Sequence, residues 1–297
     1  MNHVAAVPLD PSLAQFLGKA SSTNGIDFYS RRLEDGILTV IAPSSVEEKF
    51  FAAAQIITIA ENVVISTAAV DRLFGEIVIA CGVLGKKPIL TDDNDVSAII
   101  STLKTGAEIV PKSELLDALT SGNGQRDGEV RIDIDKAFPV KGIGTVALGI
   151  VARGTVNAHD KLYHNGKQVE IKSIQSQDED IKQAGVWTRV GLAMKGVDHS
   201  EIEKGDLFTA SPAKKALEVE ADIMLSSIAG EQADVGRVYG FASGFNYTNA
   251  TVLAAAPGKA SFRLDRAIGI QPGDQFLLFR EKAPRIFGGG KVAAVKA

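Results

Sequence analysis

Two kinds of hydrophobic run alternate along the first 121 residues of the chain. Short apolar runs rich in Val and Ile indicate buried strands, and longer runs with apolar residues every three or four positions indicate helices. The predicted strands are Val4–Val7, Ile37–Ile41, Val63–Ser66, Pro88–Thr91 and Glu108–Val110. The predicted helices are Ser12–Ala20, Val46–Ala60, Ala68–Gly85, Asp95–Lys104 and Lys112–Leu119. This alternation predicts a parallel sheet covered by helices on both faces.

The pattern changes after a polar, glycine-bearing stretch at Ser121–Gln125, the best predicted boundary in the chain. Val130, Ile132 and Ile134 then alternate with charged residues, as in a half-buried strand, and short apolar runs follow between glycine turns. A weaker boundary at Ala210–Ala213 precedes further strands. These strands are Glu218–Leu225, Ala233–Phe241, Asn249–Ala256, Ala260–Leu264 and Gln275–Arg280.

Three domains are therefore expected: an α/β domain at residues 1–122 and two antiparallel β-barrels at residues 127–211 and 213–297. The chain has 297 residues, 45% of them hydrophobic and 23% charged, as in ordinary globular proteins. Its single cysteine, Cys81, excludes an intrachain disulfide framework and a cysteine zinc cluster. With no secretory leader and no apolar run of membrane-spanning length, a cytoplasmic protein is expected.

The charge is unevenly distributed over these domains. Residues 1–122 carry 9 Lys/Arg and 15 Asp/Glu, a net charge of −6, whereas residues 213–297 carry 11 and 8, a net charge of +3. A polyanion would meet the C-terminal part more readily than the N-terminal part. The imbalance is modest, and a solvated surface explains it almost as well as nucleic-acid binding.

Three segments of the first predicted barrel resemble the second domain of translation elongation factors. They read DKAFPVKGIGTVALGIVARGTV, EIKSIQSQDEDI and TRVGLAMKGVDHSEIEKGDLF, and the nearest likeness is to the SelB-like branch of the EF-Tu family, including elongation-factor-like proteins of methanogens. The final stretch, FLLFREKAPRIFGGGKV, more loosely resembles the closing strands of the third domain of that family. The resemblance implies a P-loop-GTPase-like first domain, here degenerate, followed by elongation factor domains II and III.

The phosphate loop of that family, G-x-x-x-x-G-K-[ST], has no counterpart here. The first strand passes to the first helix through Pro8-Leu9-Asp10-Pro11, which has no glycine and no lysine, and its prolines donate no amide hydrogen. Asp10 would place a negative charge where the phosphates belong, and Ser12 is expected to cap the helix. We therefore expect that the chain binds neither the GTP nor the magnesium that the family uses.

The other two nucleotide motifs are also altered. The chain has Ala42-Pro43-Ser44-Ser45 at the position of D-x-x-G, and Thr91-Asp92-Asp93-Asn94 at the position of the guanine-reading [NT]-K-x-D. These changes argue against GTP hydrolysis, although weak nucleotide binding stays open. The acidic residues near Asp92 lack the glycine and glutamate of a calcium-binding loop, so we expect a helix cap at Asp95 or Asn94 and no metal.

The resemblance also implies a pocket for the 3′ end of aminoacyl-tRNA between the first domain and the first barrel. The positions that match this pocket are Asp135, Lys136, Phe138, Gly142, Gly144, Gln175 and Arg189. Lys136 departs from the Arg or His usual in SelB-like sequences, which leaves the amino-acid preference open. The same residues could instead belong to the wet face of an edge strand, to a barrel rim and to tight turns.

Four positive charges lie near the C-terminus, and in the EF-Tu family this domain contacts the tRNA backbone. They are Arg280, Lys282, Arg285 and Lys291. Phosphate contact and a solvated hairpin explain them equally well. Gly288–Gly290 before Lys291 are expected to form a close-packed strand, since the segment has neither the hydroxyl residue nor the helix of a phosphate loop.

The remaining aromatic and histidine residues suggest no catalytic site. Trp187, the only tryptophan, is expected in a core or an interface, with base stacking as the alternative. His159 and His164 are expected to be exposed in barrel turns, and no histidine pairs with Cys81 or a serine motif.

Three functions therefore compete. The first is a translation-factor-like protein without a GTP switch that binds tRNA or the factor site of the ribosome. The second is a pseudo-GTPase that serves as a protein-interaction module without RNA contact, and the third is a GTP-binding factor with a rebuilt site. No DNA or membrane partner is expected.

Overall fold

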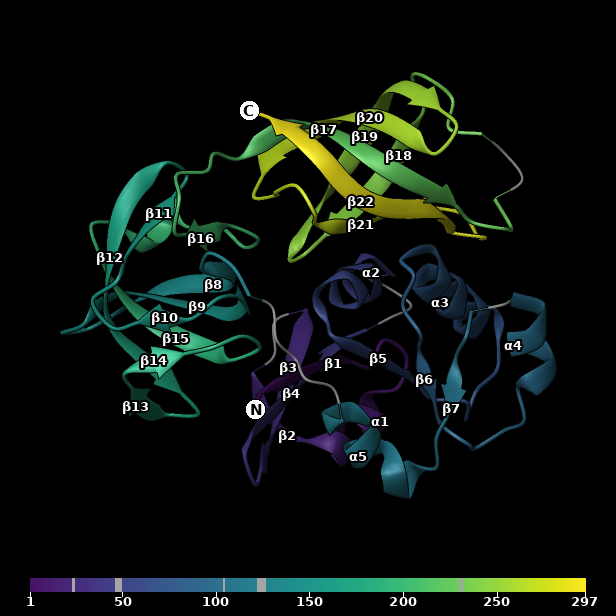
Figure 1. The fold of residues 1–297 in the computed structure, drawn as a ribbon, viewed down its shortest axis with the longest axis horizontal. Coiled ribbons are helices and arrows are strands. Elements are labelled where there is room, and N and C mark those ends of the chain that lie inside the picture. Colours follow the sequence, from purple (N-terminus) through teal and green to yellow (C-terminus); the bar gives the residue numbers. More distant parts are fainter. Residues whose placement is uncertain (23–24, 46–49, 104, 122–126, 230–231) are drawn as a thin grey trace.

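The computed structural model describes residues 1–22, 25–45, 50–103, 105–121, 127–229 and 232–297. Three bodies surround a common junction: a sheet domain (β1 to α5), a first barrel (β8 to β16) and a second barrel (β17 to β22) (Figure 1). Most of the predicted linker, at residues 122–126, lies outside the described residues, so the boundaries at 122 and 127 stay predictions.

The sheet domain contains a seven-stranded sheet in the order β2-β3-β4-β1-β5-β6-β7. The five strands from β4 to β7 in this order are parallel, and β2 and β3 add an antiparallel edge. The strands are β1 His3–Ala6, β2 Lys19–Ser22, β3 Ile26–Leu33, β4 Gly36–Pro43, β5 Asn62–Ile65, β6 Ile89–Leu90 and β7 Glu108–Ile109. The core of the parallel sheet thus follows the predicted strands, whereas β2 and β3 were not predicted.

Helices cover both faces of this sheet, as predicted. One hydrophobic cluster joins the sheet to α2, α3 and α4, and another joins its opposite face to α1 and α5. The helices are α1 Pro11–Leu17, α2 Phe50–Ile59, α3 Arg72–Val83, α4 Ser97–Leu103 and α5 Leu115–Thr120, with a 3-10 turn, η1 Lys112–Glu114, before α5. The helix predicted to reach Ala20 ends at Leu17, because Gly18 is extended and residues 19–22 pair with β3 as strand β2.

The first barrel closes six antiparallel strands, in the order β11-β16-β8-β9-β15-β12, through a pairing of β12 with β11. Its strands are β8 Arg131–Val140, β9 Gly144–Arg153, β11 Lys161–His164, β12 Lys167–Ser176, β15 Arg189–Lys195 and β16 Leu207–Thr209. Three short strands, β10 Val156–Asn157, β13 Glu179–Ile181 and β14 Gln183–Ala184, and the 3-10 turn η2 His199–Glu201 lie beside them. The alternating apolar residues Ile132 and Ile134 point into its core, as their spacing predicts.

The second barrel is also closed, in the order β17-β20-β19-β18-β21-β22. Its strands are β17 Ala216–Leu225, β18 Val238–Ser243, β19 Asn246–Ala256, β20 Lys259–Ile268, β21 Gln275–Phe279 and β22 Ile286–Lys296. The prediction of a close-packed strand at Gly288–Gly290 is confirmed. A Cβ atom on Gly290 would lie 1.9 Å from the carbonyl oxygen of Asp222, and one on Gly289 would lie 3.0 Å from Val83 of α3.

Helix α2 fastens the sheet domain to the second barrel. It is apolar on all sides, as expected for a helix enclosed by protein. One hydrophobic cluster runs from the sheet through α2 to Phe245, Leu277 and Phe279 of the second barrel, and it includes Trp187 of the first. Gln55 donates to the Phe245 carbonyl at 2.6 Å, and Thr58 accepts from the Gly244 amide at 2.9 Å. The three bodies therefore share one buried core.

Candidate functional site

The turn between β1 and α1 is occupied by its own side chain. Asp10 Oδ1 accepts hydrogen bonds from the amides of Ser12 and Leu13, at 2.9 and 3.2 Å, and from the Ser12 hydroxyl at 2.6 Å. Although partial burial opposes ionisation, these hydrogen bonds lower the pKa of Asp10. The helix cap is therefore Asp10, and the prediction of Ser12 is wrong. The amides at the start of α1, which would face an anion, bind this carboxylate instead.

The segment after β6 is likewise held by internal hydrogen bonds. Thr91 Oγ1 donates to Asp93 at 2.5 Å and accepts from the Thr67 amide at 2.8 Å. Asn94 Nδ2 donates to the Thr67 carbonyl at 2.7 Å, and Lys112 pairs with Asp93 at 2.8 Å. These polar groups are satisfied by one another, which leaves little free hydrogen-bonding capacity for a purine ring.

Nearby, Asp95 accepts from the Ser97 amide at 2.9 Å at the start of α4, which confirms the predicted cap. No group of three or more His, Cys, Asp or Glu side chains within the described residues is arranged to hold a metal ion. Among the described helices, none combines the length and hydrophobicity needed to cross a membrane.

A polar groove of about 440 Å³ lies between the sheet domain and the first barrel. Residues 19–22 of β2 and Ser30 of β3 form one wall, and residues 175–178 and 189–191 of the first barrel form the other. Gln175 is exposed there, and its Nε2 donates to Asp180 at 2.9 Å. The Ser30 hydroxyl donates to Gln177 across the groove at 3.0 Å, which fixes the width of the groove. The lining is rich in hydroxyl and amide groups.

Arg189 links the two walls of this groove. Its Nη2 donates to Asp135 and to the Ser22 hydroxyl, both at 3.2 Å, and its guanidinium lies 3.3 Å from the centre of the Phe28 ring. Burial, which outweighs the attraction of Asp135, lowers the pKa of Arg189. Asp135 itself is 1% exposed, with Lys204 at 3.9 Å. Arg189, paired with Asp135 inside the first barrel, therefore joins that barrel to the sheet domain through Ser22 and Phe28.

The other predicted pocket residues lie on the hairpin of β8 and β9, outside the lining of the groove. The Lys136 ammonium stands 6.0 Å from the centre of the Phe138 ring. Gly142 and Gly144 are exposed and have φ angles of 84° and 100°, which glycine adopts without strain. Arg189 and Gln175 thus line the groove, with Asp135 bonded to Arg189, whereas the other four predicted residues do not line it.

The four C-terminal basic residues do not form one patch. Arg285 faces the sheet domain, 3.7 Å from Glu76 of α3 and 4.9 Å from the centre of the Phe50 ring, and Arg280 lies over Phe287. Lys282 is exposed. Lys291 lies in β22, six residues after Arg285. At the rise of an extended strand, this spacing places the two residues roughly 20 Å apart.

Two other predictions have clear outcomes. Trp187 is 2% exposed in the shared core, which confirms a core role for it. His164 is 5% exposed and lies 2.7 Å from Asp206, so the prediction of an exposed side chain is wrong for it, although His159 is exposed. His164 is buried because β11 lies between two barrel strands, where Asp206 supplies a hydrogen-bond partner.

Sequence reasoning missed Ser21, Ser22 and Ser30 in the groove, because it did not predict β2 and β3. The alternation of Ile26 and Phe28 with Asp27 was the available signal for β3.

Comparison with known proteins agrees with this architecture. A family model described as elongation factor Tu domain 2 matches residues 144–209. An uncharacterized protein of Methanocaldococcus jannaschii is 28% identical over 290 residues, which cover 93% of this chain and 94% of that protein. The selenocysteine-specific elongation factor of the same organism is 35% identical over 116 residues, which cover 37% of this chain and 25% of that factor. The chain therefore spans about a quarter of the length of that named factor.

Among solved structures, translation elongation factor SelB from Methanococcus maripaludis in its apo form matches with a TM-score of 0.80 at 19% identity, over 100% of this chain and 80% of that chain. The bacterial selenocysteine-specific elongation factor EF-Sec matches with the same TM-score, over 98% of this chain and 58% of that chain. The predicted fold, a mixed sheet followed by two barrels, and the resemblance to EF-Tu/SelB-like elongation factors are confirmed.

Proposed function

We propose that this elongation-factor-like protein binds the acceptor end of tRNA or aminoacyl-tRNA without a GTP switch. The observation that carries the proposal is the contrast between two sites of the sheet domain. At the nucleotide position, Asp10 and Thr91 are held by neighbouring protein groups. In the groove beside the first barrel, hydroxyl and amide groups line an open volume of about 440 Å³.

The groove has the chemistry that a terminal nucleotide needs. Ser21, Ser22, Gln175 and Gln177 provide donors and acceptors for ribose hydroxyls and base edges. Lys19 adds a positive charge on the β2 wall, which favours a phosphate nearby. Arg189 connects the two walls through Ser22 and Phe28, and Asp135, its ion-pair partner within the first barrel, positions it behind the groove.

The lack of a switch follows from the shared core. A GTP-driven change would have to separate α2 from the second barrel, which would expose Phe245 and Phe279 and break the hydrogen bond of Gln55. Nothing at the turn before α1 would supply the energy, because Asp10 already occupies the amides there. We therefore infer a fixed arrangement and no GTP hydrolysis.

Filter binding tests this function. Labelled aminoacyl-tRNA and deacylated tRNA are measured at two salt concentrations, with Gln175→Ala as the groove variant and Lys161→Ala, an exposed residue of β11, as the control. The proposal predicts salt-dependent retention, which Gln175→Ala weakens by roughly tenfold because a buried hydrogen bond to RNA is lost. Equal, negligible retention of both RNAs would show that the groove does not bind RNA.

A protein-interaction module without RNA contact is the second candidate. Its support is the internal pairing of Arg189 with Asp135 and Phe28, because the charge of this arginine is already balanced by a protein carboxylate. The same filter experiment separates the two candidates, since this second one predicts no retention at either salt concentration.

A further inference from the structure

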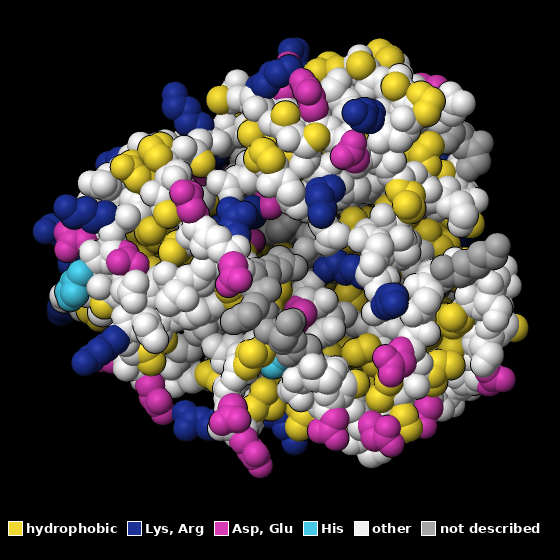
Figure 2. All heavy atoms as spheres, viewed as in Figure 1, with side chains coloured by type: hydrophobic (Ala, Val, Ile, Leu, Met, Phe, Trp, Pro, Cys, Tyr) yellow, Lys and Arg dark blue, Asp and Glu magenta, His cyan; other side chains and the backbone are white. Residues whose placement is uncertain are grey.

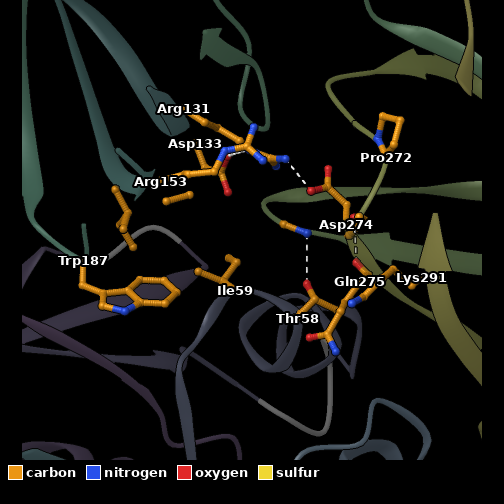
Figure 3. Close-up of a pocket in the computed structure, with 15 residues that line it drawn as sticks. Thr58, Ile59, Arg131, Asp133, Arg153, Trp187, Pro272, Asp274, Gln275 and Lys291 are labelled. Atoms are coloured by element: carbon orange, nitrogen blue, oxygen red, sulfur yellow. Dashed lines mark hydrogen bonds and ion pairs between the residues drawn. The ribbon is translucent and has the colours of Figure 1, made fainter. Parts of the chain in front are cut away.

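A cavity of about 320 Å³ lies where the three bodies meet (Figure 3). The sheet domain contributes Thr58 and Ile59, the first barrel contributes Arg131, Arg153 and Trp187, and the second barrel contributes Asp274 and Lys291. Its volume lies within the range of small-molecule sites, which often form between domains. Figure 2 shows both basic and acidic side chains around this junction.

The two carboxylates of the cavity share one arginine. Arg131 Nε donates to Asp133 at 2.7 Å, and its Nη1 donates to Asp274. Burial opposes the charge of Arg131, but the attraction of both carboxylates raises its pKa. Asp274 also accepts from the Gln271 amide at 2.8 Å. This network links the two barrels and leaves one negative charge in excess, spread over two carboxylates.

Two further cations face the same cavity without a carboxylate of their own. Arg153 donates only to neutral oxygens, the Glu129 carbonyl at 3.2 Å and Gln271 Oε1 at 3.4 Å. Lys291 has no ion pair with any described residue, although Asp222 lies across the ladder from it. The three cations and two carboxylates give the cavity a net charge of +1 in a partly enclosed space. An anion would relieve this excess charge.

We propose that the cavity binds a compact phosphorylated molecule, whose phosphate lies between Arg153 and Lys291. Arginine and lysine from different bodies can share the oxygens of one phosphate, since the guanidinium binds two oxygens and the ammonium a third. The organic part of the ligand faces an apolar wall formed by Trp187, Ile59 and Ile150. Because its contacts come from all three bodies, the ligand stabilises their assembly. This site is separate from the groove and does not depend on RNA binding there.

The single tryptophan makes the proposal measurable, because Trp187 lines the cavity and is the only indole in the chain. The full chain is titrated with glycerol phosphate at constant ionic strength, with glycerol and sulfate as the neutral and the anionic control. A saturable change in tryptophan fluorescence is expected with the phosphate ester, with a weaker response to sulfate and none to glycerol. A response that rises linearly without saturation would overturn the proposal.

Charge variants test the two cations. Replacing both Arg153→Gln and Lys291→Gln is expected to weaken binding at least tenfold, because hydrogen bonds from two charged donors are lost. Lys282→Gln, which removes one positive charge from an exposed position of the second barrel, should leave the affinity unchanged. Wild-type affinity in the double variant would contradict the site. A short RNA duplex is added in competition: no displacement of the glycerol phosphate is expected for a site that takes a compact ligand, and displacement by the duplex would contradict the proposal.

Discussion

The nucleotide position of the sheet domain and the groove beside the first barrel differ in where their polar groups point. At the first, Asp10, Thr91 and Asn94 bind neighbouring protein atoms. At the second, Gln175 and the serines of β2 also make single hydrogen bonds to protein, but they line an open groove of about 440 Å³. The first site lies within the sheet domain, whereas the second lies between the sheet domain and the first barrel. Open volume beside polar groups is thus found at the interface of the two bodies, which is where the proposed function places the ligand.

The shared core can hold the three bodies together without a nucleotide. Nucleotide-driven proteins hold their switch segments in place through the ligand. In this protein, apolar contacts hold the bodies together, since α2 is buried between the sheet and the second barrel. The following predictions test this comparison, and they begin with the core because the largest effects are expected there.

Phe245→Ala is expected to lower the free energy of unfolding by about 3–5 kcal/mol, because the ring is 2% exposed and packs 6.2 Å from Phe28 across the domain interface. Denaturant unfolding measures this change. Leu253→Ala, on an exposed position of β19, serves as the control and should change stability by less than about 0.5 kcal/mol. Similar small effects for both variants would mean that the two domains do not share a core.

Arg189→Ala should destabilise the protein by about 3 kcal/mol, since it leaves the buried Asp135 carboxylate without its closest partner. Arg189→Lys keeps the charge and should recover part of this loss, but not the contact with Phe28. Thermal unfolding of the three proteins gives the comparison. If Arg189→Ala left the stability unchanged, Arg189 would not hold the structure together and would instead be available to contact a ligand in the groove.

Asp10→Ala removes the cap of α1 and should lower stability by about 1 kcal/mol. The same variant frees the helix amides and removes a negative charge, and it nevertheless should not bind GDP, because no lysine or glycine loop is present. Calorimetric titration with GDP and magnesium measures binding directly. Recovered binding in this variant would show that Asp10 alone blocks the nucleotide.

Acid should destabilise the protein partly through Asp206. Burial opposes its ionisation, but hydrogen bonds from His164, the Glu203 amide and Lys215 lower its pKa below 3.8. The folded state therefore binds fewer protons than the unfolded state, and this stabilisation is present above pH 3.8 and lost as the pH falls through the lower folded value. Asp206→Asn should flatten the fall in stability at low pH, while Asp117→Asn, on the exposed face of α5, should not.

Local patterns predicted the elements well where they carried a clear period. The alternation of Val130, Ile132 and Ile134 predicted β8, and the glycine turns predicted the rest of the barrel order. The pattern did not predict β2 and β3, because the strand after Gly18 is polar and exposed at the sheet edge. The hydrophobic pattern of a segment does not predict an edge strand of this kind, because β2 is held by pairing with β3 and by a contact with the first barrel.

The candidate site was less predictable, because its geometry depends on how domains dock. Asp135 and Arg189 were identified, but their burial against Phe28 needs a contact between distant parts of the chain. The same holds for His164, whose partner Asp206 is 42 residues away. The central cavity could not be predicted, since Arg153 and Lys291 meet there only after all three bodies assemble.

The most direct test of the account is calorimetric titration of the full chain with GTP and magnesium. Because Asp10 occupies the helix amides and no phosphate loop is present, no saturable heat is expected up to about 1 mM nucleotide. A dissociation constant in the micromolar range would contradict the account, since it would require a nucleotide site where the sequence and the hydrogen bonds leave none.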